Sequence, residues 1–324
     1  GANKAVDIPE MWQHSFDNGI SILGAQSVET PTTSVLLKIP AGHYYTTKNK
    51  AGTAGLVVSM FRESTTERSA EDMSKALQKL GSSVYISAGN RYLNINISSL
   101  TKNLDATLSL VNEQLRAPAF LESEFERVKN NAIQGALNNK KDAGYLASTA
   151  YRQLLNADNI AAMPSSGSEE SLTNISLEDV KAFYQQQVKP FGGQLIAVSD
   201  LGQAELTKSL SILENWQGKG AGLQLSLPEG NGKMGAIYLV NKDDAAQSVI
   251  RIGKRSMTQD ITGEYYKSSL MNFALGGAFN SRINLNLRED KGWSYGSRTI
   301  MIPTNSQRPF FVQAPVQTDR TADS

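Results

Sequence analysis

The stretch LGGAFNSRINLNLREDKGWSY, residues 275–295, carries more specific residue choices than any other part of the chain. A glycine pair at 276–277 interrupts an apolar helical run, and Asn280 or Ser281 can then cap a new helix. We expect this helix to end near Gly292 and a strand to begin directly after it. The stretch therefore predicts a capped helix that leads through a glycine turn into a strand.

Arg288 and Tyr295 are the candidate functional residues of this stretch. Arg288 falls on the last turn of the predicted helix, and Tyr295 lies at the start of the predicted strand. An arginine donates a rigid fork of hydrogen bonds to a carbonyl or carboxylate, and a tyrosine hydroxyl can stabilise a developing oxyanion. The same spacing also suits a plain alternative, in which Arg288 and Glu289 form a solvated salt bridge at a helix end.

The pattern LGG-x-x-x-SR-x-x-x-x-LRE-x-x-G-x-x-Y in this stretch resembles the signature of the second homologous domain in pitrilysin/insulinase zinc metallopeptidases. The resemblance implies an α+β fold of two homologous lobes, each a mixed or antiparallel sheet covered by helices. It also implies that Arg288 and Tyr295 face the zinc site of another domain across a closed chamber. There Arg288 would anchor a peptide carbonyl or C-terminal carboxylate, and Tyr295 would contact the oxyanion.

The zinc motif of the same family is the inverted His-x-x-Glu-His motif on a helix, within a run that resembles G-L-A-H-L-L-E-H-M-L-F-K-G-T. Residues 52–65, GTAGLVVSMFREST, align with this run without a gap. Gly55 and Ser59 then occupy the histidine positions, and Val58 occupies the glutamate position. Because none of these side chains can hold zinc or activate water, we expect no metal site in this chain.

The family's third zinc ligand, a glutamate, should fall near Gly135, but no glutamate occurs between Glu126 and Glu169. The chain has two histidines, His14 and His43, and we expect each to have a surface or turn role. The resemblance therefore implies that zinc is held by a partner half and not by this chain.

The composition excludes several functional classes. The chain has 324 residues, of which 40% are hydrophobic, so it can bury two ordinary cores. Its 32 Lys and Arg residues nearly balance its 31 Asp and Glu residues, which argues against nucleic acid or an anionic membrane as the main partner. The absence of cysteine excludes disulfides, a cysteine zinc site and a thiol nucleophile. No apolar stretch approaches the roughly 18 residues of a membrane span.

Residues 217–233 hold five glycines and one proline and are the natural linker between two lobes. The first lobe would cover residues 1–216. The second, residues 234–324, repeats the order strand (236–240), turn, strand and helix that opens the first. Because the second lobe lacks the closing helices of the first, we expect it to be incomplete at its C-terminus and the chain to be a piece of a longer polypeptide.

We therefore expect this chain to be a zinc-free half of a pitrilysin/insulinase-like peptidase and to be inactive alone. It would supply substrate contacts to a zinc-bearing half, which is part of the same polypeptide or a separate subunit. Bacterial family members suggest the periplasm or cell envelope, with the cytoplasm as the alternative.

Two other functions stay open. The lobe pair could be a purely structural interaction scaffold, or an unrelated module could bind peptides at the edge of a predicted strand over residues 92–98. A dinucleotide site is disfavoured, because the glycines of residues 218–222 follow a helix and not a strand.

Overall fold

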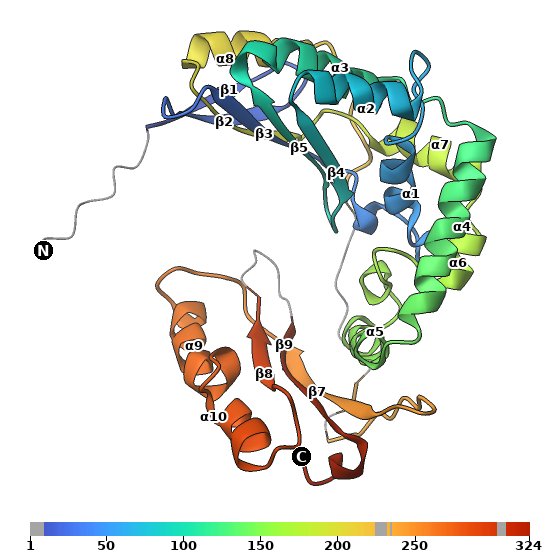
Figure 1. Ribbon diagram of the computed structural model, residues 1–324, viewed down its shortest axis with the longest axis vertical. Helices are drawn as coiled ribbons and strands as arrows, with labels where there is room; N and C mark the ends of the chain where they lie inside the picture. Colours follow the sequence, from blue (N-terminus) through green and yellow to red (C-terminus); the bar gives the residue numbers. More distant parts are fainter. Residues whose placement is uncertain (1–9, 224–231, 234, 303–308) are drawn as a thin grey trace, which may run out of the picture. The chain divides into compact units, whose positions relative to one another are not determined.

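The computed structural model describes residues 10–223, 232–233, 235–302 and 309–324. The chain forms two compact units, the first built from Gly1–Ala136 with Pro164–Leu225 and the second from Leu137–Met163 with Ser226–Ser324. Each unit combines a β-sheet with packed helices, so the predicted α+β fold is confirmed (Figure 1). The predicted lobe boundaries, 1–216 and 234–324, remain a proposal.

The first unit is organised around a six-stranded sheet in the order β1-β2-β6-β3-β5-β4. β2 and β6 are parallel, and every other neighbouring pair is antiparallel. The late strand β6 thus separates β2 from β3, which follow each other in sequence. The strands are β1 Met11–Ser15, β2 Ser21–Gln26, β3 Thr32–Ile39, β4 Ser83–Ala88, β5 Leu93–Leu100 and β6 Gln194–Ser199.

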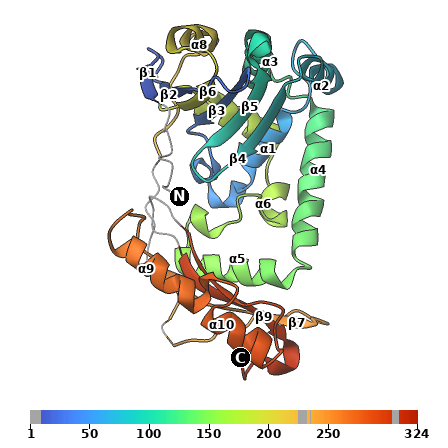
Figure 2. The same cartoon turned by 60° about the vertical axis from the view of Figure 1, so that its left-hand side comes forward.

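Helices cover one face of this sheet, with α2, α3 and α8 side by side (Figures 1 and 2). Val35 and Leu37 point to that face and are almost completely buried, whereas Leu36 between them is only half-buried. This alternation follows from the pleat of a strand, which turns successive side chains to opposite faces. The helices are α1 Thr53–Met60, α2 Ala70–Lys79, α3 Leu104–Arg116, α4 Glu122–Asn139, α6 Glu169–Thr173, α7 Leu177–Gln187 and α8 Gln203–Leu210.

Local sequence signals set several helix ends. Ser69 caps α2 by accepting a hydrogen bond from the backbone N–H of Asp72, and Ser176 caps α7 in a full capping box with Asp179. Gly81 follows α2 with a φ of +61°, the left-handed conformation that glycine adopts without strain. Serines therefore mark where these two helices start, and a glycine marks where α2 stops.

The second unit has a smaller, antiparallel sheet in the order β7-β9-β8. Leu287, Ala314 and Val316 form a small core between one face of this sheet and the helical segment that carries the Arg288 signature. The helix α5 packs against the other face, where the rings of Tyr151 and Phe311 lie 5.7 Å apart. The elements are α5 Ala143–Asn156, β7 Gln247–Arg255, α9 Glu264–Asn272, η6 Phe273–Gly277, α10 Arg282–Asn284, η7 Leu285–Asp290, β8 Arg298–Met301 and β9 Pro309–Gln317.

The predicted strand over residues 236–240 is wrong. This segment has no regular structure, and the side chains of Ile237 and Leu239 are 96% and 88% exposed. In the first unit the corresponding strand, β2, is held between β1 and β6. Among the described residues of the second unit, no strand lies in the place of β6 beside β7, so an apolar alternating segment finds no hydrogen-bonding partner there.

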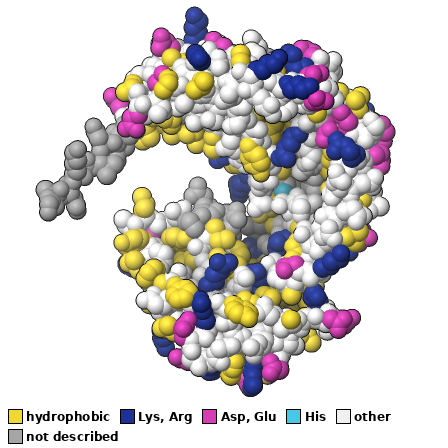
Figure 3. Space-filling view, in the orientation of Figure 1, with side chains coloured by type: hydrophobic (Ala, Val, Ile, Leu, Met, Phe, Trp, Pro, Cys, Tyr) yellow, Lys and Arg dark blue, Asp and Glu magenta, His cyan; other side chains and the backbone are white. Residues whose placement is uncertain are grey.

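Side chains of both charges are interspersed over the face shown in Figure 3, without a large area of one sign. This pattern agrees with the formal net charge of +1. In the part of the chain that the structure describes, no helix has the length and apolar character needed to cross a bilayer.

Candidate functional site

Arg288 lies on the short helical segment formed by α10 and η7 in the second unit. Its neighbour Leu287 is 6% exposed and packs into the small core against Ala314 and Val316. Burial of Leu287 fixes the rotation of the segment, and Arg288 is consequently turned toward the surface, with 39% of its side chain exposed. Ser281 stands at the predicted N-cap position, but its side chain makes no capping hydrogen bond.

The Arg288 guanidinium is held by two near neighbours. Its Nε lies 3.3 Å from a carboxylate oxygen of Glu289, and its Cζ lies 4.6 Å from the centre of the Phe279 ring. The ion pair is the plain alternative that the sequence left open, and exposed pairs of this kind contribute about 0–1 kcal/mol. The aromatic platform is additional: it orients the plane of the guanidinium and leaves its Nη donors able to reach a ligand.

Tyr295 does not begin a strand, so that prediction is wrong. β8 starts only at Arg298, and the preceding residues form an irregular loop. The reason is that the backbone N–H groups of Trp293 and Ser294 donate to the carbonyl of Leu287, at 2.9 and 3.2 Å, rather than to a neighbouring strand. The side chain of Tyr295 is 88% exposed.

These two backbone hydrogen bonds bring the loop back onto the helix end that carries Arg288. Tyr295 follows Ser294, and Arg288 follows Leu287, so both candidate residues flank the same hydrogen-bonded turn. No hydrogen bond joins their side chains within the described segments, and neither side chain is buried. The guanidinium and the phenol are therefore two separate donors presented from one end of one element.

Asn284 supports this arrangement and was missed by sequence reasoning. It is 4% exposed, its Nδ2 donates to the Phe279 carbonyl at 2.6 Å, and its Oδ1 accepts from the Ser297 N–H at 2.9 Å. One amide thus ties the residue that carries the aromatic platform to the loop that carries Tyr295. The one signal in the sequence was a polar residue within an apolar run, INLNL, which does not reveal its partners.

The three zinc-motif positions lie together on α1 in the first unit. The Ser59 hydroxyl donates to the Gly55 carbonyl at 3.0 Å, and Val58 is 3% exposed and belongs to the core. A β-carbon added at Gly55 would meet nothing within 4 Å. The helix is thus intact over the positions where the resemblance would place the motif, and these positions carry Gly55, Val58 and Ser59.

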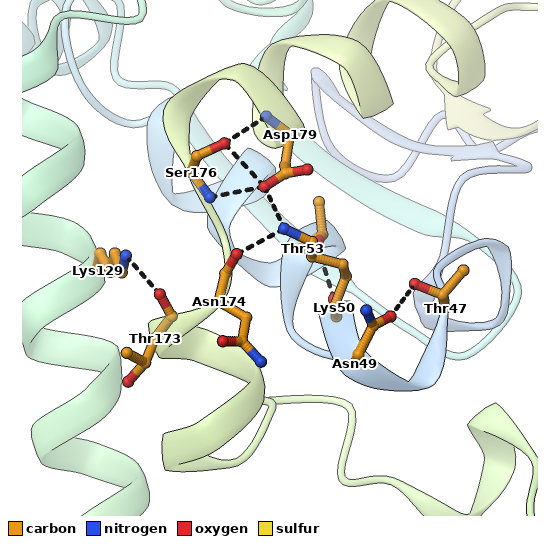
Figure 4. A network of polar contacts seen from close by, with 9 residues as sticks. All are labelled: Thr47, Asn49, Lys50, Thr53, Lys129, Thr173, Asn174, Ser176 and Asp179. Carbon is orange, nitrogen blue, oxygen red and sulfur yellow. Dashed lines mark hydrogen bonds and ion pairs between the residues drawn. The ribbon is translucent and has the colours of Figure 1, made fainter.

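A polar network holds the start of α1 in place (Figure 4). The Lys50 ammonium contacts the Asp179 carboxylate at 2.6 Å and the Asn174 carbonyl at 2.5 Å, while the Thr53 hydroxyl donates to the Lys50 carbonyl at 2.7 Å. Burial by itself would raise the pKa of Asp179, but hydrogen bonds from Lys50 and Ser176 outweigh burial and the pKa is lowered. The network is structural support and contains no reactive pair.

Potential metal ligands are scattered over the chain. In the segments that the structure describes, no three His, Asp or Glu side chains gather to form a metal site. His14 is exposed on β1 and lies edge-on to Phe16, with ring centres 5.6 Å apart. His43 is buried in a short turn, 5.8 Å from the Tyr44 ring.

Each of the two units combines a sheet with packed helices, and family models match both parts of the chain. A family model described as insulinase (peptidase family M16) matches residues 22–162, and one described as peptidase M16 inactive domain matches residues 174–324. The chain belongs to the insulinase family, peptidase family M16.

Three known proteins show the extent of the similarity. A Helicobacter pylori protein described as the non-peptidase homolog YmxG is 27% identical over 268 residues, which is 82% of this chain and 61% of that protein. A solved peptidase M16 inactive domain from Pseudomonas fluorescens has a TM-score of 0.85 at 22% identity, covering 95% of this chain and 74% of that one. The periplasmic protease PqqL from Escherichia coli has a TM-score of 0.72 at 16% identity, covering 98% and 37%. The chain thus spans about three fifths of the curated relative's length.

Proposed function

We propose that this chain is the zinc-free half of an M16-type metalloendopeptidase and contributes substrate contacts to a zinc-bearing homologous half. That half would be another part of the same polypeptide or a separate subunit, and this chain would be inactive alone. The observation that carries the proposal is the pair of accessible donors, Arg288 and Tyr295, at one helix end, in a chain whose zinc-motif positions are Gly55, Val58 and Ser59.

The chemistry of the two donors differs. Arg288 offers a planar fork of hydrogen-bond donors, which suits a peptide carbonyl or C-terminal carboxylate. Tyr295 offers a single hydroxyl, which suits the oxyanion that develops when a peptide carbonyl is attacked. Zinc in the partner half would supply the activated water for that attack. The role of this chain is to bind and orient the peptide and to stabilise negative charge.

The test uses the complete assembly with Arg288→Ala or Tyr295→Phe and measures the kcat of peptide cleavage. Removing one oxyanion donor is expected to reduce kcat about 10²-fold, or about 3 kcal/mol. Arg320→Ala and Tyr266→Phe are matched controls, because Arg320 is an exposed arginine beside acidic residues and Tyr266 an exposed tyrosine in the same unit. Unchanged turnover in both site variants would remove the catalytic role.

A structural role is the second candidate, and one observation favours it: the similar Helicobacter pylori protein is described as a non-peptidase homolog. In that case the ion pair between Arg288 and Glu289 would only help to pack the surface of the second unit and would not contact a substrate. The companion half discriminates the two functions, because an intact His-x-x-Glu-His motif there supports the peptidase and its absence supports the scaffold.

We also propose a periplasmic or cell-envelope location, with the cytoplasm as the alternative. The support is the similarity to PqqL, which is described as periplasmic. Cell fractionation followed by immunodetection tests this location directly.

A further inference from the structure

The face of the second unit's sheet that is turned toward α5 carries a cross-strand row of Arg251, Gln313 and Arg298, here called the arginine row. Arg251 on β7 and Arg298 on β8 are both directly opposite Gln313 on the central strand β9. Residues that are directly opposite in an antiparallel pair share a face, so the three side chains project together. The two arginines are separated by two strand spacings, about 10 Å, which long side chains can bridge toward one ligand.

The arginine row lies on the face opposite the Arg288 helix. Ala314, the neighbour of Gln313 on β9, points into the small core with Leu287. Successive side chains of a strand alternate between faces, so the row points away from that core and toward the α5 side. It is therefore a feature separate from the Arg288 and Tyr295 pair.

Arg251 is a half-buried cation, and its hydrogen bond and its ring contact within the described part of the chain are to uncharged groups. Its Nη2 donates to the Gln313 amide oxygen at 3.2 Å, and its Cζ lies 4.6 Å from the Phe311 ring centre. Its Nε is buried and has no hydrogen-bond partner among the described residues. Burial lowers the pKa of Arg251, the hydroxyl of Tyr151 opposes this, and the charges of Arg152 and Arg298 lower it further.

Tyr151 forms the wall of this region on the α5 side. Its hydroxyl donates to the Phe310 carbonyl at 3.2 Å, and its ring packs against Phe311. Burial raises the pKa of Tyr151 to about 12, so the hydroxyl is neutral and supplies no counter-charge. Tyr151 consequently presents an aromatic, uncharged surface to Arg251.

These contacts are unusual for a half-buried guanidinium, because charges withdrawn from water are normally paired with an opposite charge. Here the nearby charges named above are like charges. We propose that the arginine row binds a carboxylate of the peptide substrate. Arg251 and Arg298 donate hydrogen bonds to the carboxylate. The Phe311 and Tyr151 rings form the apolar wall against which the carbon chain of the carboxylate packs. A carboxylate fits a guanidinium with two parallel hydrogen bonds.

The carboxylate could be a peptide C-terminus or an acidic side chain, and both sources present the same planar anion. The assignment of a peptide as its carrier rests on the proposed function, whereas the preference for a carboxylate rests on the arginine row itself. Two measurements on the full chain therefore separate the two ideas.

The first measurement is fluorescence anisotropy with labelled peptides that differ at one position. One pair carries Glu or Gln in the middle of an otherwise neutral sequence with an amidated C-terminus, and another compares a free with an amidated C-terminus. In at least one of the two pairs, we expect the wild type to bind the peptide that carries the carboxylate about tenfold more tightly than its neutral counterpart, because charge-assisted hydrogen bonds are stronger than neutral ones. Arg251→Gln and Arg298→Gln should abolish that preference, whereas Arg320→Gln should retain it.

The second measurement follows the arginine Nε–Hε signals by NMR during titration with N-acetylglutamate. Signals lost in Arg251→Lys and Arg298→Lys identify the two residues, and we expect these signals to shift while that of Arg320 does not. Arg251→Lys keeps the charge without the fork and guards against a variant that fails to fold.

Peptides that bind without any charge preference would overturn the carboxylate site and leave peptide binding intact. Shifts with N-acetylglutamate but no bound peptide would support the site and overturn the proposed function. Absence of both effects would overturn both.

Discussion

Asn284 should be the residue on which the shape of the Arg288 and Tyr295 region depends most. Replacing it by alanine removes the donor to the Phe279 carbonyl and the acceptor of the Ser297 N–H. Because Asn284 is 4% exposed, water does not readily replace these bonds. Each buried group left without a partner costs about 1–3 kcal/mol, so we expect Asn284→Ala to destabilise the second unit by about 3 kcal/mol.

Urea denaturation gives the change in free energy, and hydrogen exchange gives its location. The Ser297 amide should exchange faster in Asn284→Ala, because its acceptor has been removed. Asn286→Ala is the matched control, since Asn286 is exposed on the same segment. Equal stability of the two variants, or an unchanged exchange rate at Ser297, would refute the reasoning that one amide holds both sides of the site.

Three further predictions concern the rest of the fold. Gly55→Ala should stabilise α1 by about 0.5–1 kcal/mol, because alanine favours a helix and its β-carbon meets nothing there. Gly276→Ala should destabilise the second unit, because its β-carbon would lie 2.5 Å from the Thr299 hydroxyl oxygen. Thermal unfolding measures both effects. Because the pKa of Asp179 is lowered in the folded state, its ion pair with Lys50 stabilises the fold at any pH above the ordinary pKa of about 4. This stabilisation is lost as the pH falls through the lower pKa of the folded state. Acid unfolding of Lys50→Met should therefore depend less on pH than acid unfolding of the wild type. Backbone amides of residues 236–240 should exchange within the fastest class and those of β6 within the slowest, and equally slow exchange in both would contradict the irregular structure of 236–240.

Local signals in the sequence predicted the parts of the fold that local physics decides. A serine followed three residues later by an aspartate is a capping signal, and the caps at the starts of α2 and α7 are formed by such pairs. Asp17, Asn18 and Gly19 are typical turn residues, and they join β1 to β2 in a hairpin. Nothing local reveals that the Asn18 amide also donates to the distant Leu213 and Trp216 carbonyls.

Features that depend on distant partners could not be predicted in this way. The strand β4 was missed, because its short alternating sequence, SVYISA, becomes a strand only by pairing with β5. The segment 236–240 has a strand-like sequence but no partner beside it in the described chain. Tyr295 was placed in a strand because the sequence does not show that its neighbours bond to Leu287.

The candidate site shows the same division. The sequence predicted that Arg288 stands on the last turn of a helix, and the structure places it in η7, which ends at Asp290. The Phe279 platform and the Asn284 bridge depend on how the chain folds back on itself, and no spacing rule encodes them. Arg251 and Arg298 come together only through the pairing of β7 and β8 with β9.

The most direct test of the proposed division of labour is the single-turnover rate of peptide cleavage by the complete assembly carrying Tyr295→Phe, compared with Tyr266→Phe. The proposal predicts a cleavage step slowed about 10²-fold by the first change and unaffected by the second. Equal rates for the two variants would contradict the claim that this chain stabilises the reacting peptide.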